Sequence, residues 1–482
     1  MSGTDWIALL PVIIVGATSI VVMLALSIRR SYAVTVWLTL IGLAAAFASL
    51  WPAGSVAPRQ VTLLLVVDRY AIFYMGLIIA ACFAVVLISY GYFEKQPGQR
   101  EELYILLLLA TLGAQVLVTS TDFVSFFLGL EILSVSLYAL IAYQRTKSRP
   151  LEAGIKYLIL AASSAAFLLF GMALIYAVLG TMQFSEIAAR LASQANPSLG
   201  ILLPATVLLI TGIGFKLGVV PFHLWTPDVY EGASAPVTAY IATVSKGSMF
   251  AILLRYFYGF SFAHDRALYI VFAIIAIASM FTGNLLALRQ NNVKRVLAYS
   301  SIAHLGYLLV AFLAGGRLAA EAVTFYLVAY FITMLGAFAV VAVLSDSGGE
   351  AELINDYRGL FWRRPVLAGI FTIMLLSLAG IPLTAGFLAK FFILAAGASG
   401  SIWGLILILV ITSVIGLFYY LRIVVAMYAD LPQASESEPT PSLSLPLTSG
   451  FALAVLAILL VWFGVYPTQL MELIRIAVAN LI

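Results

Sequence analysis

The sequence predicts an all-α, polytopic membrane protein of about fourteen transmembrane helices, and three observations support this fold class. Hydrophobic residues make up 63% of the 482 residues, charged residues make up only 10%, and the mean hydropathy is +1.10. A soluble domain carries roughly a quarter charged residues, so a water-soluble enzyme and a disordered protein are both excluded. The apolar residues also form continuous runs of about 20 residues, whereas a β-barrel would show short alternating segments.

Apolar runs between charged residues or proline and glycine breaks mark the spans in order along the chain. We expect spans at 6–28, 33–52, 70–93, 102–119, 121–143, 153–180, 200–221, 236–258, 267–288, 295–315, 319–345, 365–398, 402–429 and 446–466. The first run lacks a small-residue cleavage site after a basic start, so it is expected to be a span and not a removable signal peptide. The longest polar pieces, 346–364 and 430–445, are expected to be connectors within a single membrane domain over 1–482.

The distribution of Lys and Arg predicts the orientation of the chain. An even number of spans places both termini on the same side of the membrane. The loops after odd-numbered spans, with the adjoining helix ends, hold 14 basic residues, and the opposite side holds 7. Because basic loops stay in the cytoplasm, the odd-numbered loops are expected to be cytoplasmic and both termini periplasmic.

Four of the seven lysines lie inside apolar runs, namely Lys156, Lys216, Lys246 and Lys390, whereas all eighteen arginines are expected outside them. A desolvated lysine can release its proton near neutral pH, but an arginine stays protonated. These four lysines are therefore candidate proton-transfer groups. Lys156 is the weakest candidate, because it lies near a helix end and Glu152, four residues before it, could satisfy it as an ion pair.

Two of the lysine-bearing spans are interrupted by glycine and proline. Lys216 lies in TGIGFKLGVVP at 211–221, and Lys390 follows AGIPLTAG at 379–386. Proline removes a backbone hydrogen bond and clashes with the preceding turn. Broken spans that carry charged groups in both halves of the chain are typical of transporters, where irregular backbone borders protein or water. Two ordinary proline kinks are the alternative.

One carboxylate, that of Glu131, is expected in the middle of a span. Five intramembrane ionisable groups at roughly 3 kcal/mol each would cost on the order of 15 kcal/mol if they all faced lipid. They must therefore face the interior, pair with each other or contact water. We expect Glu131 to form a switchable ion pair with Lys216, because the helix of Lys216 is broken. The alternative is a fixed pair that only ties two helices together.

Two histidines are candidate relay groups. His304 lies in AYSSIAHLGYLL beside Ser301 and Tyr307, and His223 lies in PFHLW next to the break of its span. A neutral histidine can pass protons along a chain of water. For each of them, a buried histidine that is merely hydrogen-bonded is the alternative.

The rare residues argue against a cofactor in this chain. Cys82 is the only cysteine, so the chain cannot form an internal disulfide or hold an iron–sulfur cluster. The three histidines show no spacing typical of haem or zinc, and no GxGxxG or Walker motif is present. The energy for any transport is therefore expected to come from elsewhere. The net charge of +4 gives no argument for nucleic acid as a partner.

Three segments carry a resemblance to a known family. They are GFKLGVVPFHLWTPDVYEGASAPVTAYIATVSKGSMF at 214–250, KRVLAYSSIAHLGYLLVA at 294–311 and YRGLFWRRPVLAGIFTIMLLSLAGIPLTAGFLAKFF at 357–392. Essentially the whole chain resembles the subunit N family of the bacterial proton-pumping NADH–quinone oxidoreductase, respiratory complex I. The resemblance implies fourteen transmembrane helices with broken helices 7 and 12. It also implies two inverted five-helix repeats, here about 102–258 and about 267–429.

The resemblance also implies roles for residues already singled out. It places Glu131, Lys216, Lys246 and Lys390 at the positions of the family's proton-translocating groups. It implies a multi-pass subunit of the bacterial inner membrane that contacts the other membrane and peripheral subunits of complex I. NADH, FMN, iron–sulfur clusters and quinone would be bound by those partners. The alternative is a subunit of a multisubunit sodium/proton antiporter, which is homologous and shares the lysine pattern. A purely structural membrane spacer is a third, which the buried charges disfavour.

Overall fold

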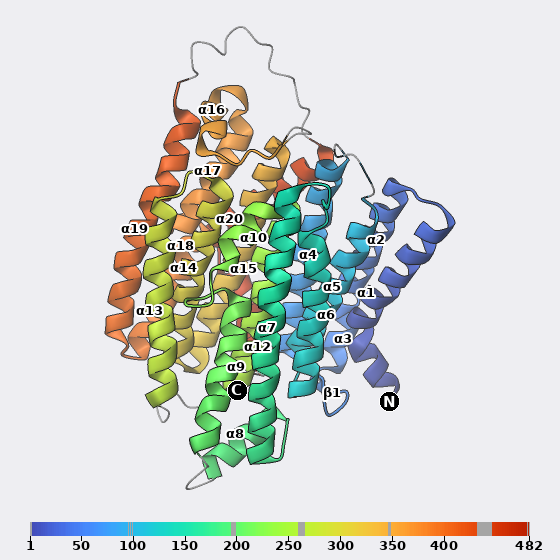
Figure 1. Cartoon of the computed structure of the whole chain (residues 1–482), viewed down its shortest axis with the longest axis vertical. Helices are drawn as coiled ribbons and strands as arrows, with labels where there is room; N and C mark the ends of the chain where they lie inside the picture. Colours follow the sequence, from blue (N-terminus) through green and yellow to red (C-terminus); the bar gives the residue numbers. More distant parts are fainter. Residues whose placement is uncertain are drawn as a thin grey trace.

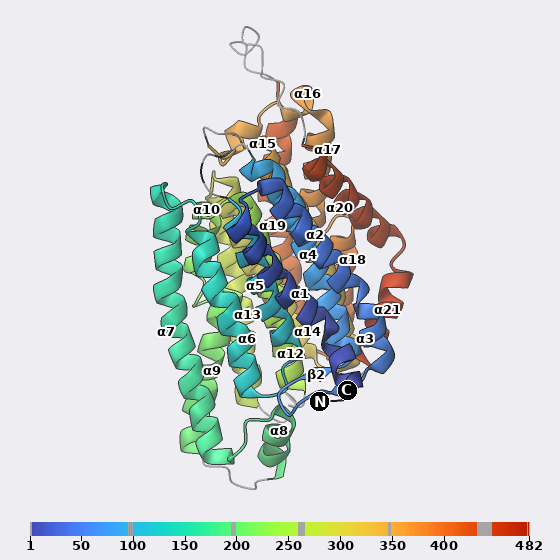
Figure 2. The ribbon, with the colours of Figure 1, turned by 90° about the vertical axis from the view of Figure 1, so that its right-hand side faces the viewer.

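A computed structural model shows a bundle of long α-helices that lie side by side (Figures 1 and 2). The structure describes residues 2–94, 96, 98, 100–193, 199–258, 266–345, 349–430, 446–479 and 481. Within these residues, thirteen helices are long and apolar enough to cross a membrane. Two shorter apolar helices, Pro365–Ala379 and Ala385–Ser399, together take the place of the predicted span 365–398. The predicted all-α membrane fold is therefore confirmed, with one segment for each predicted span.

The helices and strands are α1 (Gly3–Ile28), α2 (Tyr32–Ala48), α3 (Leu50–Val56), β1 (Arg59–Gln60), β2 (Val66–Val67), α4 (Arg69–Phe93), α5 (Glu102–Thr119), α6 (Phe123–Ile141), α7 (Ser148–Leu179), α8 (Phe184–Ser193), α9 (Leu199–Leu217), α10 (Trp225–Gly232), α11 (Ala235–Tyr240), η1 (Ile241–Ser245), α12 (Lys246–Tyr258), α13 (Arg266–Leu288), α14 (Val293–Ala314), α15 (Gly316–Leu344), η2 (Ile354–Tyr357), α16 (Leu360–Arg363), α17 (Pro365–Ala379), α18 (Ala385–Ser399), α19 (Trp403–Tyr428), α20 (Leu447–Val465) and α21 (Thr468–Val478). Strands β1 and β2 form a short antiparallel pair. The spans that the sequence predicts leave out α8, α10, α16, α21 and the two strands, because each of these elements is too short to cross a bilayer.

The centre of the bundle is formed by the eighth, tenth and eleventh crossings. In the most apolar 18-residue stretches of α14 and α15, 94% of the residues are buried inside the protein. In that of Ala235–Phe257, all of the residues are buried. In the corresponding stretches of α1 and α20, only 28% of the residues are buried. Figure 1 shows α1 and α2 at one side of the bundle and α13 and α19 at the other. The buried helices are therefore the ones that can shelter charged groups from lipid.

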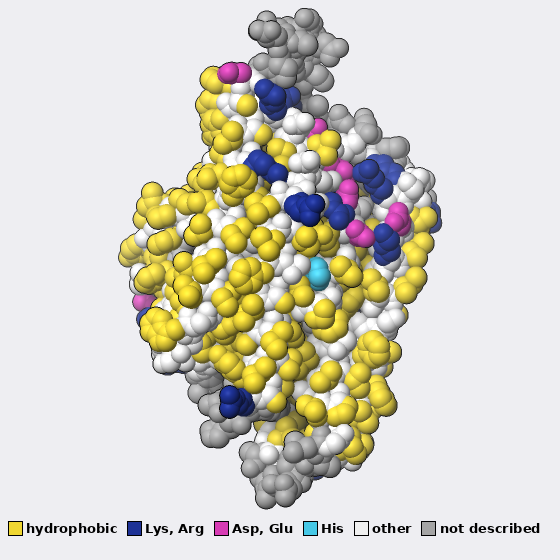
Figure 3. Space-filling view, turned by 60° about the vertical axis from the view of Figure 1, so that its left-hand side comes forward, with side chains coloured by type: hydrophobic (Ala, Val, Ile, Leu, Met, Phe, Trp, Pro, Cys, Tyr) yellow, Lys and Arg dark blue, Asp and Glu magenta, His cyan; other side chains and the backbone are white. Residues whose placement is uncertain are grey.

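Hydrophobic and charged side chains are separated along the long axis of the molecule. Figure 3 shows a broad region of hydrophobic side chains, with most of the basic and acidic side chains gathered above it. Both chain termini lie toward the end that carries α8, and α16 lies at the opposite end (Figures 1 and 2). An even number of crossings gives this arrangement, with the loop before α17 on the side opposite to the termini.

Two crossings are interrupted, and in each of them a glycine ends the helix. The seventh crossing runs as α9 to Leu217, and Gly218 then takes a left-handed conformation with φ +71°. The twelfth runs as α17 to Ala379, and Gly380 follows with φ +83°. Glycine adopts this conformation without steric cost, so it commonly terminates helices. The breaks that the sequence predicts are present, although the helices stop at these glycines and before the prolines.

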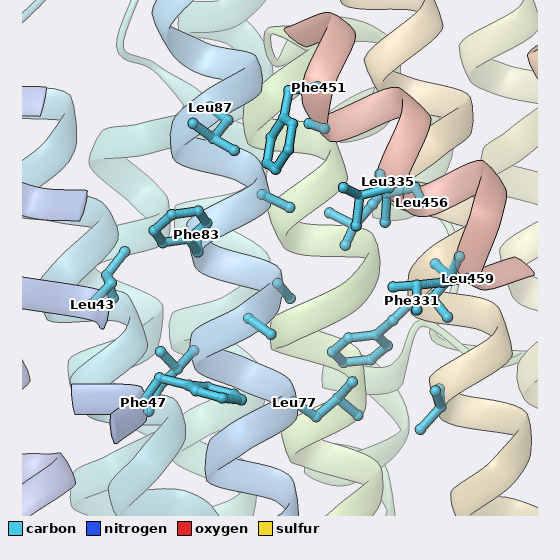
Figure 4. Close-up of a pocket in the computed structure, with 18 of the residues that line it drawn as sticks. Leu43, Phe47, Leu77, Phe83, Leu87, Phe331, Leu335, Phe451, Leu456 and Leu459 are labelled. Carbon is cyan, nitrogen blue, oxygen red and sulfur yellow. The ribbon is translucent and has the colours of Figure 1, made fainter. Parts of the chain in front are cut away.

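The eighth crossing is continuous but carries a π-helical turn, η1, directly before Lys246. Such turns are uncommon in proteins, and those that occur are often found at functional sites. At the next residue, Gly247, an added Cβ would meet the ring of Phe331 on α15, so the two helices approach closely here. Phe331 also lines an apolar cavity of about 490 Å³ between α2, α4, α15 and α20 (Figure 4). The backbone around Lys246 is thus irregular and tightly packed against α15.

Candidate functional site

Three of the predicted lysines lie in the interior of the bundle. Lys216, Lys246 and Lys390 are 4%, 1% and 8% exposed, and each lies on one of the three irregular crossings. Within the described part of the chain, none of them forms an ion pair with a carboxylate. A buried ammonium needs hydrogen-bond acceptors or negative charge nearby, so the neighbours of each lysine decide what it can do.

Each of these lysines donates a hydrogen bond to a serine hydroxyl and lies over at least one aromatic ring. The hydrogen bonds join Lys216 to Ser134 (2.5 Å), Lys246 to Ser301 (2.8 Å) and Lys390 to Ser413 (2.7 Å). The rings are Tyr157 for Lys216, Trp225 and Tyr230 for Lys246, and Tyr307 for Lys390, with Nζ between 5.2 and 5.6 Å from each ring centroid. Hydroxyl oxygens and π faces stabilise an ammonium less than a carboxylate does. A hydroxyl can also donate to a neutral amine, so these sites suit both protonation states.

Lys390 is held more firmly than the other two. Its Nζ also donates to the carbonyl oxygens of Leu378 (3.0 Å) and Ala379 (2.8 Å), at the C-terminal end of α17. With Ser413, these acceptors satisfy all three of its N–H groups. The C-terminal end of a helix carries partial negative charge, which favours a cation. The break of the twelfth crossing therefore serves as a binding site for the ammonium of Lys390.

A chain of hydroxyl groups leads from Lys246 toward His304. The hydroxyl of Ser301 accepts hydrogen bonds from Lys246 and from Tyr330 (2.8 Å). The ring of Tyr330 lies 5.7 Å from that of His304, and Nδ1 of His304 is 2.7 Å from the hydroxyl of Tyr326. A small cavity of about 10 Å³ borders His304, Tyr326 and Tyr330, which is close to the smallest space that holds one water. On its other side, the ring of His304 lies 5.4 Å from that of Tyr307, over which the amine of Lys390 lies.

The expected ion pair between Glu131 and Lys216 is not formed in this structure. Lys216 bonds instead to Ser134, which lies one helical turn after Glu131 on α6. Oε1 of Glu131 is buried and has no hydrogen-bond partner within the described residues. Because Ser134 follows Glu131 by one helical turn, the Glu131 carboxylate lies on the turn next to the one that Lys216 contacts. The carboxylate and the ammonium are therefore neighbours in an open arrangement, with Ser134 as the bonded partner.

Lys156 and His223 lie outside this group. The side chain of Lys156 is 47% exposed and forms ion pairs with Glu152 (2.7 Å) and Asp228 (3.1 Å), so it belongs to the charged rim and not to the membrane interior. The pair with Glu152 is the one that the sequence spacing predicts. His223 is buried, but its Nδ1 has no hydrogen-bond partner in the part of the chain that is described. The structure does not bring either residue into the chain from Lys246 to His304.

Two buried ion pairs were missed by the sequence analysis. Arg255 lies inside the eighth crossing and makes two bonds of 2.9 Å to Asp68, which corrects the expectation that every arginine lies outside the spans. Its charge is tolerated because the paired carboxylate neutralises it. Lys294, at the start of α14, pairs with Glu350. Both cations lie near the ends of apolar runs, and nothing in the sequence indicates which carboxylate they meet.

The charged rim near Lys294 is a network of acidic and basic side chains. Arg295 pairs with Glu231 (2.7 Å), and Arg149 pairs with Glu352 (3.0 Å). Burial raises the pKa of the Glu352 carboxyl, while the charge of Lys294 opposes that shift. No group of three or more His, Cys, Asp or Glu side chains able to hold a metal ion is found within the described residues. The rim therefore offers ion pairs and hydrogen bonds.

Comparisons with known proteins identify the family to which the chain is similar. Residues 120–416 match the family model described as NADH:quinone oxidoreductase/Mrp antiporter, TM. The chain is 49% identical to the NADH-quinone oxidoreductase subunit N of Ectopseudomonas mendocina, over 97% of this chain and 96% of the relative. It is 46% identical to the NADH-quinone oxidoreductase subunit N of Methylococcus capsulatus, over 96% and 94%.

A solved structure shares both the fold and part of the sequence. A chain of respiratory complex I from Thermus thermophilus with bound aureothin is 32% identical, with a TM-score of 0.81, and the match covers 96% of this chain and 98% of that chain. The match extends over nearly the full length of both chains. These similarities show that the chain belongs to the NADH-quinone oxidoreductase subunit N family.

Proposed function

We propose that this chain is a membrane-arm subunit of a bacterial NADH–quinone oxidoreductase and that it moves protons across the inner membrane. The observation that carries the proposal is the set of three buried lysines, each bonded to a hydroxyl and none to a carboxylate in the described part of the chain. A lysine locked to a carboxylate would hold its proton, whereas these surroundings allow its release.

The proposed path crosses the bundle from Glu131 to Lys390. Lys216 takes a proton when its broken helix brings it against Glu131 and releases it when the pair opens, as in this structure. Lys246 receives the proton, and Ser301, Tyr330 and His304 lead onward. Lys390, held at the end of α17, is the last group before the exit to the outside. Each group needs two states of its surroundings, and quinone reduction elsewhere in the complex would shift them.

The chemistry of electron transfer is assigned to partner subunits. The single cysteine, Cys82, is buried and cannot ligate a cluster alone, which supports binding of the iron–sulfur clusters by other subunits. On the similarity to subunit N, we assign NADH, FMN and quinone to other membrane and peripheral subunits as well. The excess of basic residues in the odd-numbered loops supports an orientation with both termini in the periplasm. The alternative is a subunit of a sodium/proton antiporter, since the matching family model includes Mrp antiporters. The full-length similarity to subunit N favours the first assignment.

Substitution of Lys246 tests the proposal in the assembled complex. Lys246→Met removes the charge and Lys246→Arg keeps it, but arginine does not release a proton near neutral pH. We expect both variants to lose most proton translocation and quinone reductase activity in membranes with equal amounts of complex. Lys147→Met, at an exposed lysine, is the control and should behave like the unmodified protein. Full pumping in Lys246→Arg would show that Lys246 is a fixed charge and not a relay.

A further inference from the structure

The amine of Lys246 is under-bonded for its degree of burial. A protonated lysine has three N–H donors, and within the described residues Lys246 makes one hydrogen bond, to Ser301 on α14. The faces of Trp225 and Tyr230 supply attraction but no acceptor atom. Lys390, by comparison, has all three donors satisfied. The surroundings of Lys246 therefore leave room for a second hydrogen-bond partner.

An unpartnered hydroxyl lies beside this amine. Thr226, at the start of α10, is fully buried, and its Oγ1 has no hydrogen-bond partner in the part of the chain that is described. A Cβ added to Gly218 would lie 2.5 Å from Oγ1 of Thr226 and 3.4 Å from Nζ of Lys246. The hydroxyl and the amine therefore both lie next to one point, the position that a Cβ on Gly218 would occupy. Buried hydroxyls are normally hydrogen-bonded, so an unbonded one next to a buried amine needs an explanation.

We propose that the hydroxyl of Thr226 is the second hydrogen-bond partner of Lys246, bonded when Lys246 leaves Ser301. This inference rests on the proposed function of Lys246 in proton transfer. Thr226 lies on α10, which follows the break of the crossing that carries Lys216, whereas Ser301 lies on α14 and accepts from Tyr330, whose ring is near His304. Lys246 then alternates between a partner on the side of Lys216 and a partner on the side of His304. Each hydroxyl can accept from an ammonium and donate to an amine, so both positions serve both protonation states.

The position of Thr226 is linked to that of Lys216 through one hydrogen bond. The indole N–H of Trp225 donates to the carbonyl oxygen of Phe215 at 2.8 Å. Trp225 directly precedes Thr226, and Phe215 directly precedes Lys216. A movement of the backbone that carries Lys216 would therefore pull on Trp225 and shift Thr226, which would make Thr226 a positioning residue for Lys246. This connection gives the proton on Lys216 a physical means of influencing which partner Lys246 takes.

The test uses three variants of the intact complex in native membranes, with rates normalised to the assembled amount. Thr226→Val keeps the shape but removes the hydroxyl, Thr226→Ser keeps the hydroxyl, and Thr39→Val is a control. Thr39 is also fully buried, but its hydroxyl bonds only to its own helix, at the carbonyl of Thr35. A hydrogen bond to a charged group changes a population by roughly tenfold, so we expect Thr226→Val to slow coupled proton translocation by about that factor. Thr226→Ser and Thr39→Val should remain close to the unmodified rate.

Two results would overturn the proposal. One is normal translocation in Thr226→Val, and the other is an equal loss in Thr226→Ser and Thr226→Val, since the hydroxyl would then not be the cause. A purely structural role is separated by the stability of the complex, because removing an unpartnered buried hydroxyl should not lower it. Lys246→Met is measured alongside: its loss of translocation with a normal Thr226→Val rejects only the role of Thr226. A normal rate in Lys246→Met rejects the proposed function itself.

Discussion

The interior lysines share one kind of environment, a serine hydroxyl with an aromatic face. Ser134, Ser301 and Ser413 come from three different helices, so this pairing is not a consequence of sequence spacing. A serine oxygen has two acceptor sites and one donor, so it can hold an ammonium and then reverse its hydrogen bond toward a neutral amine. A carboxylate would favour the ammonium in every state. The serines thus make the lysines suitable for repeated protonation.

Of the three serines, Ser301 is the one whose substitution should impair proton translocation most, because it accepts from both Lys246 and Tyr330. Ser301→Ala removes the acceptor of both Lys246 and Tyr330, which interrupts the chain to His304. We expect coupled proton translocation to fall several-fold, while Ser301→Thr, which keeps a hydroxyl, retains most of it. Proton uptake by inverted membrane vesicles measures this directly. Ser136→Ala is a suitable control, because that buried serine bonds only to the carbonyl of Ile132 on its own helix. Equal rates in Ser301→Ala and Ser136→Ala would contradict the prediction.

Glu131 is expected to act on Lys216 through its charge. Glu131→Gln keeps the shape and removes the charge, so Lys216 loses the group that holds its proton, and pumping together with quinone reduction should fall sharply. The structure identifies where the charge can be restored. Ser134 contacts Lys216, whereas Val135 is 60% exposed and faces away.

This difference gives a matched pair of second substitutions. Adding Ser134→Asp to Glu131→Gln should recover part of the activity, because the new carboxylate lies at the amine of Lys216. Adding Val135→Asp should recover none. The measurement is the rate of NADH-driven proton translocation at equal amounts of assembled complex. Wild-type pumping in Glu131→Gln alone would mean that Glu131 is only a structural tie.

At this scale the sequence indicates which groups are ionisable but not what they touch. Lys216, Lys246 and Lys390 are predictable because a lysine in an apolar run is costly and therefore rare. Their serine partners are not, because buried serines in helices are common and most of them bond to their own backbone. Ser301 is noticeable only through its neighbour His304. Thr226 gives no signal at all, since its significance depends on an unbonded hydroxyl that only the three-dimensional packing reveals.

At the scale of elements, the two interrupted crossings follow one design. Each ends in a left-handed glycine, and the Cβ that each glycine lacks would lie next to a lysine amine. For Gly218 the amine is that of Lys246, and for Gly380 it is that of Lys390. The sequence predicts the breaks from glycine and proline together, yet the glycines end the helices. Proline explains why the helix does not resume at once, and glycine explains how the turn makes space for the amine.

Gly380→Ala tests the design on the twelfth crossing. Alanine is strained at φ +83°, and its Cβ would lie 2.8 to 3.3 Å from the end of the Lys390 side chain. We expect the amine to be displaced from the carbonyls of Leu378 and Ala379, so that proton translocation falls by roughly tenfold. Gly369→Ala, on the same helix with open space around its Cα, should have no effect. Normal pumping in both variants would show that the glycine serves only to end the helix.

At the scale of the whole molecule, hydropathy predicts every crossing, because burial in lipid imposes a length of about 20 apolar residues on each helix. The short helices α8 and α21 are missed, since they are amphipathic and do not have to span anything. The buried pair of Arg255 and Asp68 is missed for a different reason. It joins residues 187 positions apart, and no local pattern reports such a contact.

The orientation of the molecule is the last expectation that can be tested. The excess of basic residues in odd-numbered loops predicts that η2 is cytoplasmic and that α8 and both termini are periplasmic. Cys82 is the only native cysteine and is buried, so Cys82→Ala provides a background for labelling with a membrane-impermeant maleimide. Asn355 on η2 and Ser185 on α8 are both exposed and suit single cysteine substitution.

Intact cells should label Ser185→Cys and leave Asn355→Cys unlabelled, because the reagent reaches only the outer face. Opening the cells should make Asn355→Cys reactive, which shows that its protection came from the membrane and not from the fold. Helix α8 and helix α16, which follows η2 closely in the chain, lie at opposite ends of the bundle, so one site is the control of the other (Figure 1). Labelling of Asn355→Cys from outside, with Ser185→Cys protected, would reverse the orientation. The direction of proton transfer from Lys216 to Lys390 would then have to be reversed with it.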